Sequence, residues 1–150
     1  MTTRRMSVSM TLDAVRARQK TVTRRHVDTW KDLRPGDRLT LIEKGMGLPK
    51  GARQVVVAEV EVVAVDVETL RQVTAAEVKA EGLWYAAMNE GVEFEDYFDE
   101  PEDCAVVWFR AFWAAGHLGG SIRDWAIGSC SGSLLGTPCR RIEWRYLEAP

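Results

Sequence analysis

The sequence predicts an α+β fold, in which strands build a barrel or sheet core and short helices lie beside it. Valines recur with partial alternation through residues 54–68, a pattern typical of a half-buried strand. A Thr-x-x-Glu capping box at Thr74 opens a short helical pattern. A length of 150 residues, 46% of them hydrophobic, suits one compact domain with its own core.

The first predicted elements are a helix over 11–18 and a strand over 38–43. Apolar residues share one face of the helical pattern. The turn sequence Arg-Pro-Gly-Asp at 34–37 precedes the alternating residues of the strand. In the valine-rich strand that follows, the glutamates should lie on the face opposite the buried valines, as in an antiparallel sheet with one solvated face.

The later predicted elements are two helices and a closing strand. The capped helix covers 75–81 and stops at Gly82. A helix over 102–116 carries a broad apolar surface, and we expect Trp108 and Trp113 to pack in the core rather than against a base. Residues 140–147 alternate apolar and charged side chains, the pattern of a strand.

Charge is distributed unevenly along the chain. Residues 1–53 hold 13 Lys or Arg and 5 Asp or Glu, whereas residues 54–150 hold 7 and 17. The basic half could face a polyanion, but a net charge of −2 argues against non-specific coating of nucleic acid. No apolar run approaches the roughly 20 residues that span a bilayer. We therefore expect a cytoplasmic protein without a membrane partner, and the oligomeric state stays open.

The cysteines predict neither a disulfide framework nor a metal site. Cys104, Cys130 and Cys139 are odd in number and lack CxxC spacing, which fits a reducing compartment. Residues 128–132 match a cysteine version of the nucleophile elbow. That elbow places its histidine after the nucleophile, whereas His26 and His117 both precede it, so we set this catalytic interpretation aside.

The segment 90–103 is strongly acidic. Eight of its 14 residues are Asp or Glu, none is Lys or Arg, and Phe94, Tyr97 and Phe98 should pin it to the body. This composition favours a solvated acidic connection, with a nucleic-acid mimic or a cover for the basic half as alternatives. Its role and that of the Gly/Ser-rich segment 128–137 stay open.

The most distinctive motif is Arg-Gln-Lys-Thr-Val-Thr-Arg-Arg at 18–25, which packs four cations and two hydroxyls into eight residues. One interpretation is a solvated basic turn. The other is a ligand site, because Lys and Arg bind phosphate or polarised carbonyl groups and a threonine beside an amine is a nucleophile beside a base.

The motif resembles the signature of ASCH domains, small β-barrel proteins related to the PUA RNA-binding fold. The family pattern is roughly Gly-x-Lys-x-x-Glu/Thr-x-Arg, and Lys20, Thr23 and Arg25 match its last three positions. Arg18 stands where the family has glycine. The resemblance covers most of residues 10–83 and 140–147. The chain is also similar to compact phage-encoded members of the family.

The resemblance implies a small mixed β-barrel of PUA-like type with flanking short helices. Residues 84–139 then look like an enlarged insertion within a single domain of residues 1–150. One ASCH branch consists of amidohydrolases that remove the acetyl group from acetylated cytidine with a lysine, a threonine and a glutamate. The matching positions are Lys20, Thr23 and Glu81.

The first hypothesis is therefore an amidohydrolase that acts on an acylated nucleoside. Glu81 lies at the end of the capped helix, where a carboxylate opposes the helix dipole; it is either an exposed helix-end residue or has a cationic partner. Lys20, desolvated among the cations Arg24 and Arg25, would have a lowered pKa and could accept a proton from the Thr23 hydroxyl or from water, and Glu81 would relay the proton to the leaving amine. Arg25 would hold the ligand or stabilise the oxyanion.

The second hypothesis is a non-catalytic module for RNA or single-stranded nucleic acid. Lys20 and the two arginines would contact phosphates, Thr21 or Thr23 would bond sugar or base, and Trp30 or Trp84 would stack. Core or rim positions are the alternative for both tryptophans. The expected ligand-binding residues are Thr21, Arg24, Arg25 and Trp30. The partner is RNA, a nucleoside or another small nucleotide-like ligand, with no cofactor and no metal.

Overall fold

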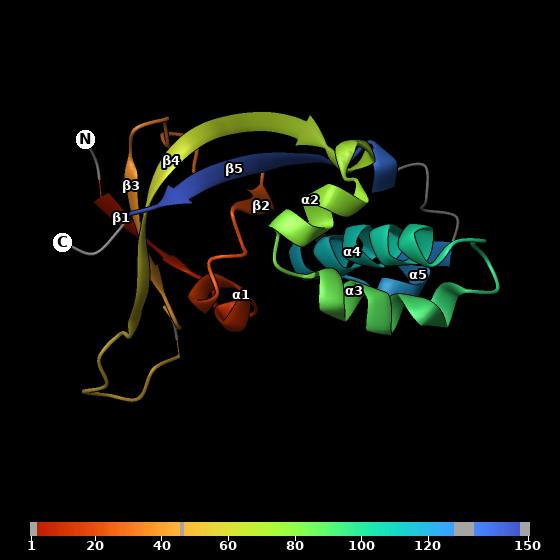
Figure 1. The fold of residues 1–150 in the computed structure, drawn as a ribbon, viewed down its shortest axis with the longest axis horizontal. Helices are drawn as coiled ribbons and strands as arrows, with labels where there is room; N and C mark the ends of the chain where they lie inside the picture. Colours follow the sequence, from red (N-terminus) through yellow and green to blue (C-terminus); the bar gives the residue numbers. More distant parts are fainter. Residues whose placement is uncertain (1–2, 46, 128–133, 148–150) are drawn as a thin grey trace.

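A curled five-stranded sheet and a group of helices make up the fold (Figure 1). The computed structural model describes residues 3–45, 47–127 and 134–147. The strands are β1 (Thr3–Ser7), β2 (Val22–His26), β3 (Arg38–Ile42), β4 (Val56–Thr69) and β5 (Pro138–Tyr146). The helices are α1 (Leu12–Arg16), α2 (Ala75–Ala80), α3 (Trp84–Gly91), α4 (Pro101–Leu118) and α5 (Ile122–Ile127), with 3-10 turns η1 (Leu70–Gln72) and η2 (Val92–Phe94). The predicted α+β class is confirmed.

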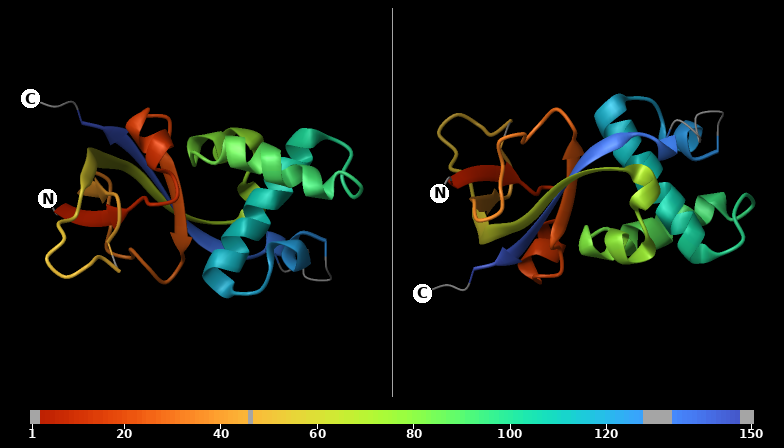
Figure 2. Two further views of the ribbon diagram at one scale, coloured as in Figure 1. Left: turned by 90° about the horizontal axis from the view of Figure 1, so that it is seen from below. Right: turned by 90° about the horizontal axis from the view of Figure 1, so that it is seen from above.

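The sheet is mixed, as predicted, but it is open. Its strand order is β1-β3-β4-β5-β2, with β1 and β3 parallel and the other pairs antiparallel. Within the described residues no strand pairing joins β1 to β2, so the barrel-like sheet expected from the sequence is present as a curled half-barrel. The long strands β4 and β5 arch from the sheet to the helices (Figures 1 and 2).

Two hydrophobic clusters hold the molecule together. One lies on the sheet, where Leu39, Val60 and Trp144 pack with Val15 of α1. The other lies among the helices around Phe109 of α4. Along β4 the buried and more exposed residues alternate from 58 to 62, so the expected burial of one face is confirmed. Trp108 and Trp113 are buried in the helical cluster, which confirms their predicted place in the core.

Each of the six predicted elements is present, with ends that shift by up to two residues. The predicted capping box is half formed, because the Thr74 hydroxyl accepts from the Glu77 backbone N–H. Four elements were missed, namely β1, β2, α3 and α5. Strand β2 was not predicted because its sequence Val-Thr-Arg-Arg-His lacks an alternation of apolar residues. Its buried Arg24 is stabilised by ion pairs with residues that are distant in the sequence.

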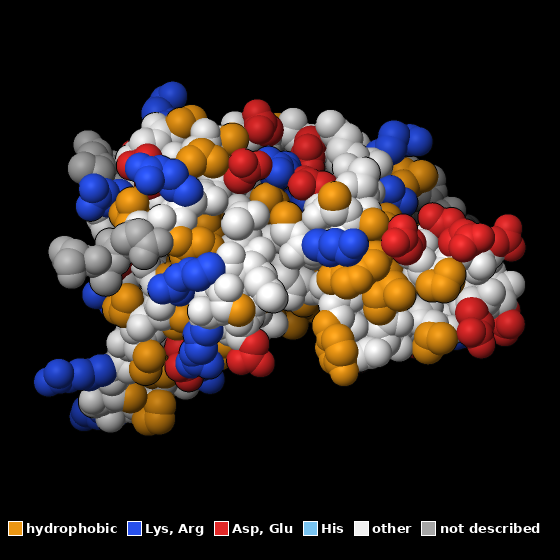
Figure 3. Space-filling view, viewed as in Figure 1, with side chains coloured by type: hydrophobic (Ala, Val, Ile, Leu, Met, Phe, Trp, Pro, Cys, Tyr) orange, Lys and Arg blue, Asp and Glu red, His pale blue; other side chains and the backbone are white. Residues whose placement is uncertain are grey.

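The acidic segment 90–103 is not a simple loop. It contains the end of α3, the turn η2 and the start of α4. Phe94 is fully buried and Phe98 packs on the helical cluster, but Tyr97 is exposed. Acidic side chains gather at the helical end of the molecule and basic ones around the sheet (Figure 3). The segment therefore does not cover the basic motif.

The helices α3, α4 and α5 occupy the described part of the region that looks like an insertion in the sequence. The single-domain assignment and the insertion over 84–139 stay predictions. The Gly-Ser-Cys-Ser-Gly motif at 128–132 lies outside the described residues. Among residues that are described, no helix is long and apolar enough to cross a membrane, and no group of three or more His, Cys, Asp or Glu could hold a metal ion.

Candidate functional site

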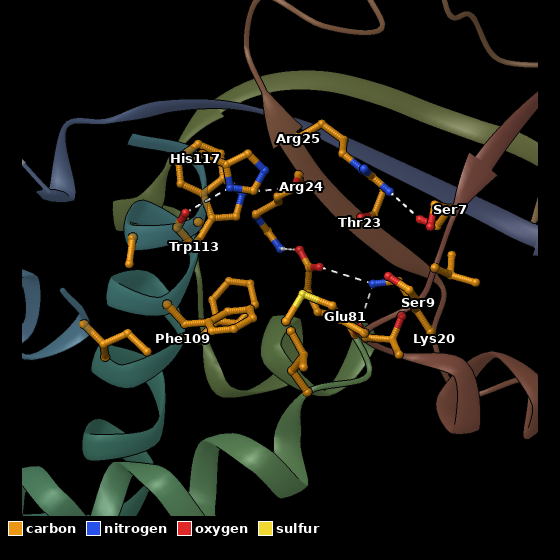
Figure 4. Close-up of a pocket in the computed structure, with 18 residues that line it drawn as sticks. Ser7, Ser9, Lys20, Thr23, Arg24, Arg25, Glu81, Phe109, Trp113 and His117 are labelled. Atoms are coloured by element: carbon orange, nitrogen blue, oxygen red, sulfur yellow. Dashed lines mark hydrogen bonds and ion pairs between the residues drawn. The ribbon is translucent and has the colours of Figure 1, made fainter. Parts of the chain in front are cut away.

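A cavity of about 590 Å³ lies between the sheet and α4. That volume falls in the range of roughly 300–1,000 Å³ found for small-molecule pockets. Lys20, Thr23 and Glu81 line it together, although they come from a loop, a strand and a helix end (Figure 4). The opposite wall is aromatic and comes from Phe109, Phe112 and Trp113.

Lys20 is held in place by both its backbone and its side chain. Its carbonyl oxygen accepts hydrogen bonds from Trp144 Nε1 at 3.1 Å and from the Tyr146 hydroxyl. Its Nζ donates to the carbonyl oxygens of Val22 at 2.9 Å and Glu81 at 2.7 Å, and lies 3.4 Å from Glu81 Oε1. Only 3% of the residue is exposed. These contacts use all three protons of an ammonium group.

The environment lowers the pKa of Lys20. Burial is the main cause, because a charged amine loses its hydration; the neighbouring Glu81 carboxylate opposes the effect, and Arg25 and Arg24 add to the lowering. The pKa stays below the ordinary value of 10.5. A buried lysine of this kind is more readily deprotonated than a surface lysine, as a general base requires.

Glu81 has the cationic partners that its position demands. It is the C-cap residue of α2, and Gly82 after it has φ +79°, the left-handed geometry that glycine adopts at helix ends. Its Oε1 faces Lys20, and its Oε2 accepts a hydrogen bond from Arg24 Nη1 at 3.0 Å. Glu81 therefore has two cationic partners, Lys20 and Arg24.

Arg24 is a buried structural cation. Its side chain has no exposed surface and contacts the carboxylates of Glu68, Glu77 and Glu81. Burial lowers its pKa, but the three carboxylates outweigh burial and the pKa is raised. Although Arg24 borders the cavity, its nitrogens are all committed to protein partners, so we assign it to holding Glu81 rather than to ligand capture.

Thr23 lies on β2, directly before Arg24 and Arg25. It is 6% exposed and borders the cavity. In the described residues no hydrogen bond involves its hydroxyl, and Lys20 Nζ bonds to carbonyl and carboxylate oxygens instead. Since no buried side-chain oxygen lacks a partner, the Thr23 hydroxyl is open to the cavity. It is therefore available to a ligand.

Arg25 and His117 face the same cavity from opposite walls (Figure 4). Arg25 Nη2 donates to the Ser7 carbonyl at 2.9 Å. The His117 ring stacks on Trp113 with 4.2 Å between ring centres, and its Nδ1 lies 2.9 Å from the Trp113 carbonyl. A carbonyl only accepts, so Nδ1 carries the proton and Nε2 is an acceptor in the neutral ring. Burial lowers the pKa of His117 and favours that neutral form.

Three other predicted residues lie outside the cavity lining. Thr21 is tied by its backbone to Ala80 and Trp144. Trp30 packs on the sheet cluster beneath the Arg4 guanidinium, 4.2 Å from its ring centre. Trp84 stacks under Lys79 on the helices. The ligand-binding role predicted for Thr21 and Trp30 therefore finds no place in this cavity.

Arg18, which stands where the motif that the sequence resembles has glycine, has a backbone conformation that glycine adopts easily. Its φ is +60°, in the left-handed region that glycine enters most easily. Its Nη1 donates to the Val15 carbonyl at 3.1 Å and its guanidinium lies over Tyr146. These contacts offset a backbone cost of about 1–2 kcal/mol.

Sequence reasoning missed the α4 side of the cavity and the segment 7–11. His117 lies in the last turn of α4, and no spacing in the sequence relates it to the basic motif. The signal that could have pointed to it is its position on the same helical face as Phe109 and Trp113, which precede it by eight and four residues.

Comparisons with known proteins give similarity in fold. No protein-family model and no curated protein matches the sequence. Similar solved structures include protein EF3133 from Enterococcus faecalis V583, described as DUF984, at 12% identity and TM-score 0.49 over 98% of this chain and 80% of that one. An ASCH domain from Lactobacillus crispatus JV V101 has 11% identity and TM-score 0.48 over 97% and 79%. Protein PF0455 from Pyrococcus furiosus has 16% identity and TM-score 0.38 over 99% and 98%.

One of these structures belongs to the family that the sequence motif resembles. Identities of 11–16% concern the fold alone, and they transfer neither ligand nor activity to this chain. The case for a function rests on the contacts around the cavity.

Proposed function

We propose that this protein hydrolyses the amide bond of an acylated nucleoside, such as acetylated cytidine, with Lys20, Thr23 and Glu81. The observation that supports this proposal is the meeting of a buried lysine of lowered pKa, an unbonded threonine hydroxyl and a carboxylate in one small-molecule cavity. A nucleophile, a base and a group that orients the base are the parts that acyl transfer requires.

Lys20 acts as the general base in its neutral form. Its two short hydrogen bonds to backbone carbonyls satisfy the two protons of a neutral amine, which leaves a lone pair on Nζ. The longer contact of 3.4 Å to Glu81 Oε1 is the one that Nζ gives up. Turning from that contact toward Thr23, Nζ takes the hydroxyl proton as Oγ1 bonds to the amide carbonyl carbon.

The remaining steps return the enzyme to its starting state. The tetrahedral intermediate collapses, the C–N bond breaks, and the proton on Lys20 passes to the departing amine. The acyl group is then an ester on Thr23 Oγ1. Water, deprotonated by Lys20, attacks this ester; the bond between the acyl carbon and Thr23 Oγ1 breaks, and the proton on Lys20 returns to Oγ1. The products are a carboxylic acid and the free amine. Glu81 stabilises the ammonium form of Lys20 in both halves of the reaction.

The aromatic wall supports a nucleoside as the ligand. Phe109, Phe112 and Trp113 border the cavity together with Thr23, and of these rings only Phe112 is partly exposed, so a nucleobase can pack its flat face against Phe112. Binding of a long RNA strand would instead need an open surface of free cations. Arg24 is saturated by carboxylates and Trp30 lies elsewhere, so this alternative draws on few residues of the basic motif.

The test is a turnover assay with a matched lysine control. Purified protein is incubated with acetylated cytidine and with other acylated nucleosides, and the products are separated by chromatography. Lys20→Met should abolish turnover, whereas Lys79→Met, which removes an exposed lysine outside the cavity, should not. Binding of short RNAs is followed by fluorescence anisotropy. Salt-sensitive RNA binding without turnover of any amide would favour the non-catalytic module and contradict the proposal.

A further inference from the structure

Arg25 differs from the other arginines of the site in having no acidic partner. Arg24 contacts three carboxylates, and Arg141 contacts Glu77 and Glu143. In the part of the chain that the structure describes, no carboxylate lies within ion-pair distance of Arg25, and its one hydrogen bond goes to the Ser7 carbonyl. It is nevertheless only partly exposed, on the cavity face of β2.

The free part of the guanidinium points into the cavity. A guanidinium has five N–H donors, and the Ser7 carbonyl takes one of them. Nε and Nη1 make no hydrogen bond within the described chain, and no side-chain nitrogen is both buried and unbonded, so these atoms remain open to the cavity. Figure 4 shows Arg25 between Ser7 and the His117 side of the cavity.

An uncompensated guanidinium at this depth is costly for the folded protein. Burial lowers the pKa of Arg25, and Glu81 opposes this only from a distance. An arginine stays protonated under these conditions, so the charge persists and lacks a counterion. A ligand that brings a negative charge would supply one, and charge-assisted bonds from a guanidinium to phosphate or carboxylate are strong.

We propose that the ligand of this cavity is anionic and that Arg25 binds its phosphate or carboxylate group, a subsite that rests on the proposed hydrolysis at Thr23. Ser9 and Thr11 also border the cavity and offer hydroxyl donors to the ligand. The preferred substrate is then an acylated nucleotide or a similar amide with an acidic group, and the neutral acylated nucleoside is a poorer substrate of the same site.

The spacing along β2 sets where the anion lies. Thr23 and Arg25 are two residues apart and border the same cavity, and successive residues of a strand on one face are about 7 Å apart. The acidic group must therefore sit several bonds away from the amide carbonyl that Thr23 attacks. A small acylated amine cannot reach both residues, whereas an acylated base that carries an acidic arm can.

The experiment compares one amide on three carriers. The substrates are acetylated cytidine, its 5′-monophosphate, and acetylated cytosine with a carboxymethyl group on N1. We expect kcat/KM to be roughly 10- to 100-fold higher for an anionic substrate than for the neutral one. The preference should vanish in Arg25→Met, persist in part in Arg25→Lys, and be unchanged in Arg16→Met, an exposed arginine outside the cavity. The two anionic substrates distinguish phosphate from carboxylate.

The outcomes separate this inference from the proposed hydrolysis. Equal kcat/KM for neutral and anionic substrates in the wild type would overturn the anion subsite and leave the hydrolase in place; this comparison does not depend on any variant folding. If no amide is cleaved, calorimetric titration with cytidine and with cytidine monophosphate decides. Tighter binding of the phosphate that is lost in Arg25→Met supports the subsite, whereas equal or undetectable binding overturns it.

Discussion

Replacing Arg24 by methionine should destabilise the folded chain by about 3 kcal/mol. The guanidinium has no exposed surface, and the carboxylate side chains that it contacts are 12% exposed at Glu68, 22% at Glu77 and 5% at Glu81. Removing one partner of a buried ion pair costs about 3–5 kcal/mol, because the remaining charge is left without compensation.

The lower end of that range applies because two of the three carboxylates keep another cation. Glu77 retains Arg141 and Glu81 retains Lys20, so Glu68 loses the most, since Arg24 is its one ion-pair partner in the described chain. A loss of 3 kcal/mol is a large part of the roughly 5–15 kcal/mol that stabilises a domain. With a slope near 2 kcal/mol/M, the urea midpoint should fall by about 1.5 M.

The assay is urea unfolding followed by tryptophan fluorescence, with Arg16→Met as the control. Arg16 pairs with Glu43 at 3.3 Å, but both side chains are about half exposed, and such surface pairs contribute about 0–1 kcal/mol. Adding Glu68→Gln to Arg24→Met should recover part of the loss, because the unpaired charge is removed. Equal midpoints for Arg24→Met and Arg16→Met would refute this account of the buried network.

Three further predictions concern the same region. Gly82→Ala should lower the free energy of unfolding in urea by roughly 2–5 kcal/mol, because φ is +79° and the new Cβ would lie 2.7 Å from the Ala14 Cβ. The control Gly36→Ala, at φ +95° with open space around it, should lower it by about 1–2 kcal/mol. Equal losses in the two variants would contradict this prediction. If neutral Lys20 is the base, kcat/KM rises with pH and levels off below 10.5; a rise that continues through 10.5 would exclude the lowered pKa. Because burial raises the pKa of Cys139 to about 11, its peptide should stay unalkylated by iodoacetamide at pH 8 until the protein is unfolded, and labelling of the native protein would contradict that burial.

The pKa shift of Lys20 also fixes the sign of its effect on stability. Its folded pKa lies below its unfolded pKa, so between the two values the unfolded chain binds more protons. Its contribution to the free energy of unfolding therefore increases as pH rises across that window.

The sequence predicted those strands and helices whose residues follow a local pattern. The valine alternation of β4 and the cap of α2 depend on neighbours in sequence; the alternation is present in the structure, and so is the Thr74 half of the capping box. Strand β2 depends on partners far along the chain. Its Arg24 is buried only because Glu68, Glu77 and Glu81 converge on it, which no local pattern reveals.

Some residues of the candidate site were likewise predictable from the sequence, and others were not. The dipole argument at Glu81 predicted a cationic partner, and the motif's spacing placed Lys20 and Thr23 in one region. The different partners of Arg24 and Arg25 could not be predicted, because Glu68, Glu77 and Glu81 lie far along the chain and only the folded structure brings them to Arg24. His117 was missed because α4 approaches β2 through tertiary packing, with Trp113 Nε1 bonded to the Arg24 carbonyl.

The most direct test of the proposed hydrolysis is the turnover number of Thr23→Val on an acylated cytidine substrate. Valine matches threonine in shape but lacks the nucleophilic oxygen. We predict that kcat falls at least about 100-fold, that Thr23→Ser retains measurable turnover, and that Thr29→Val, an exposed threonine outside the cavity, matches the wild type. Wild-type turnover in Thr23→Val would contradict the assignment of Thr23 as the nucleophile.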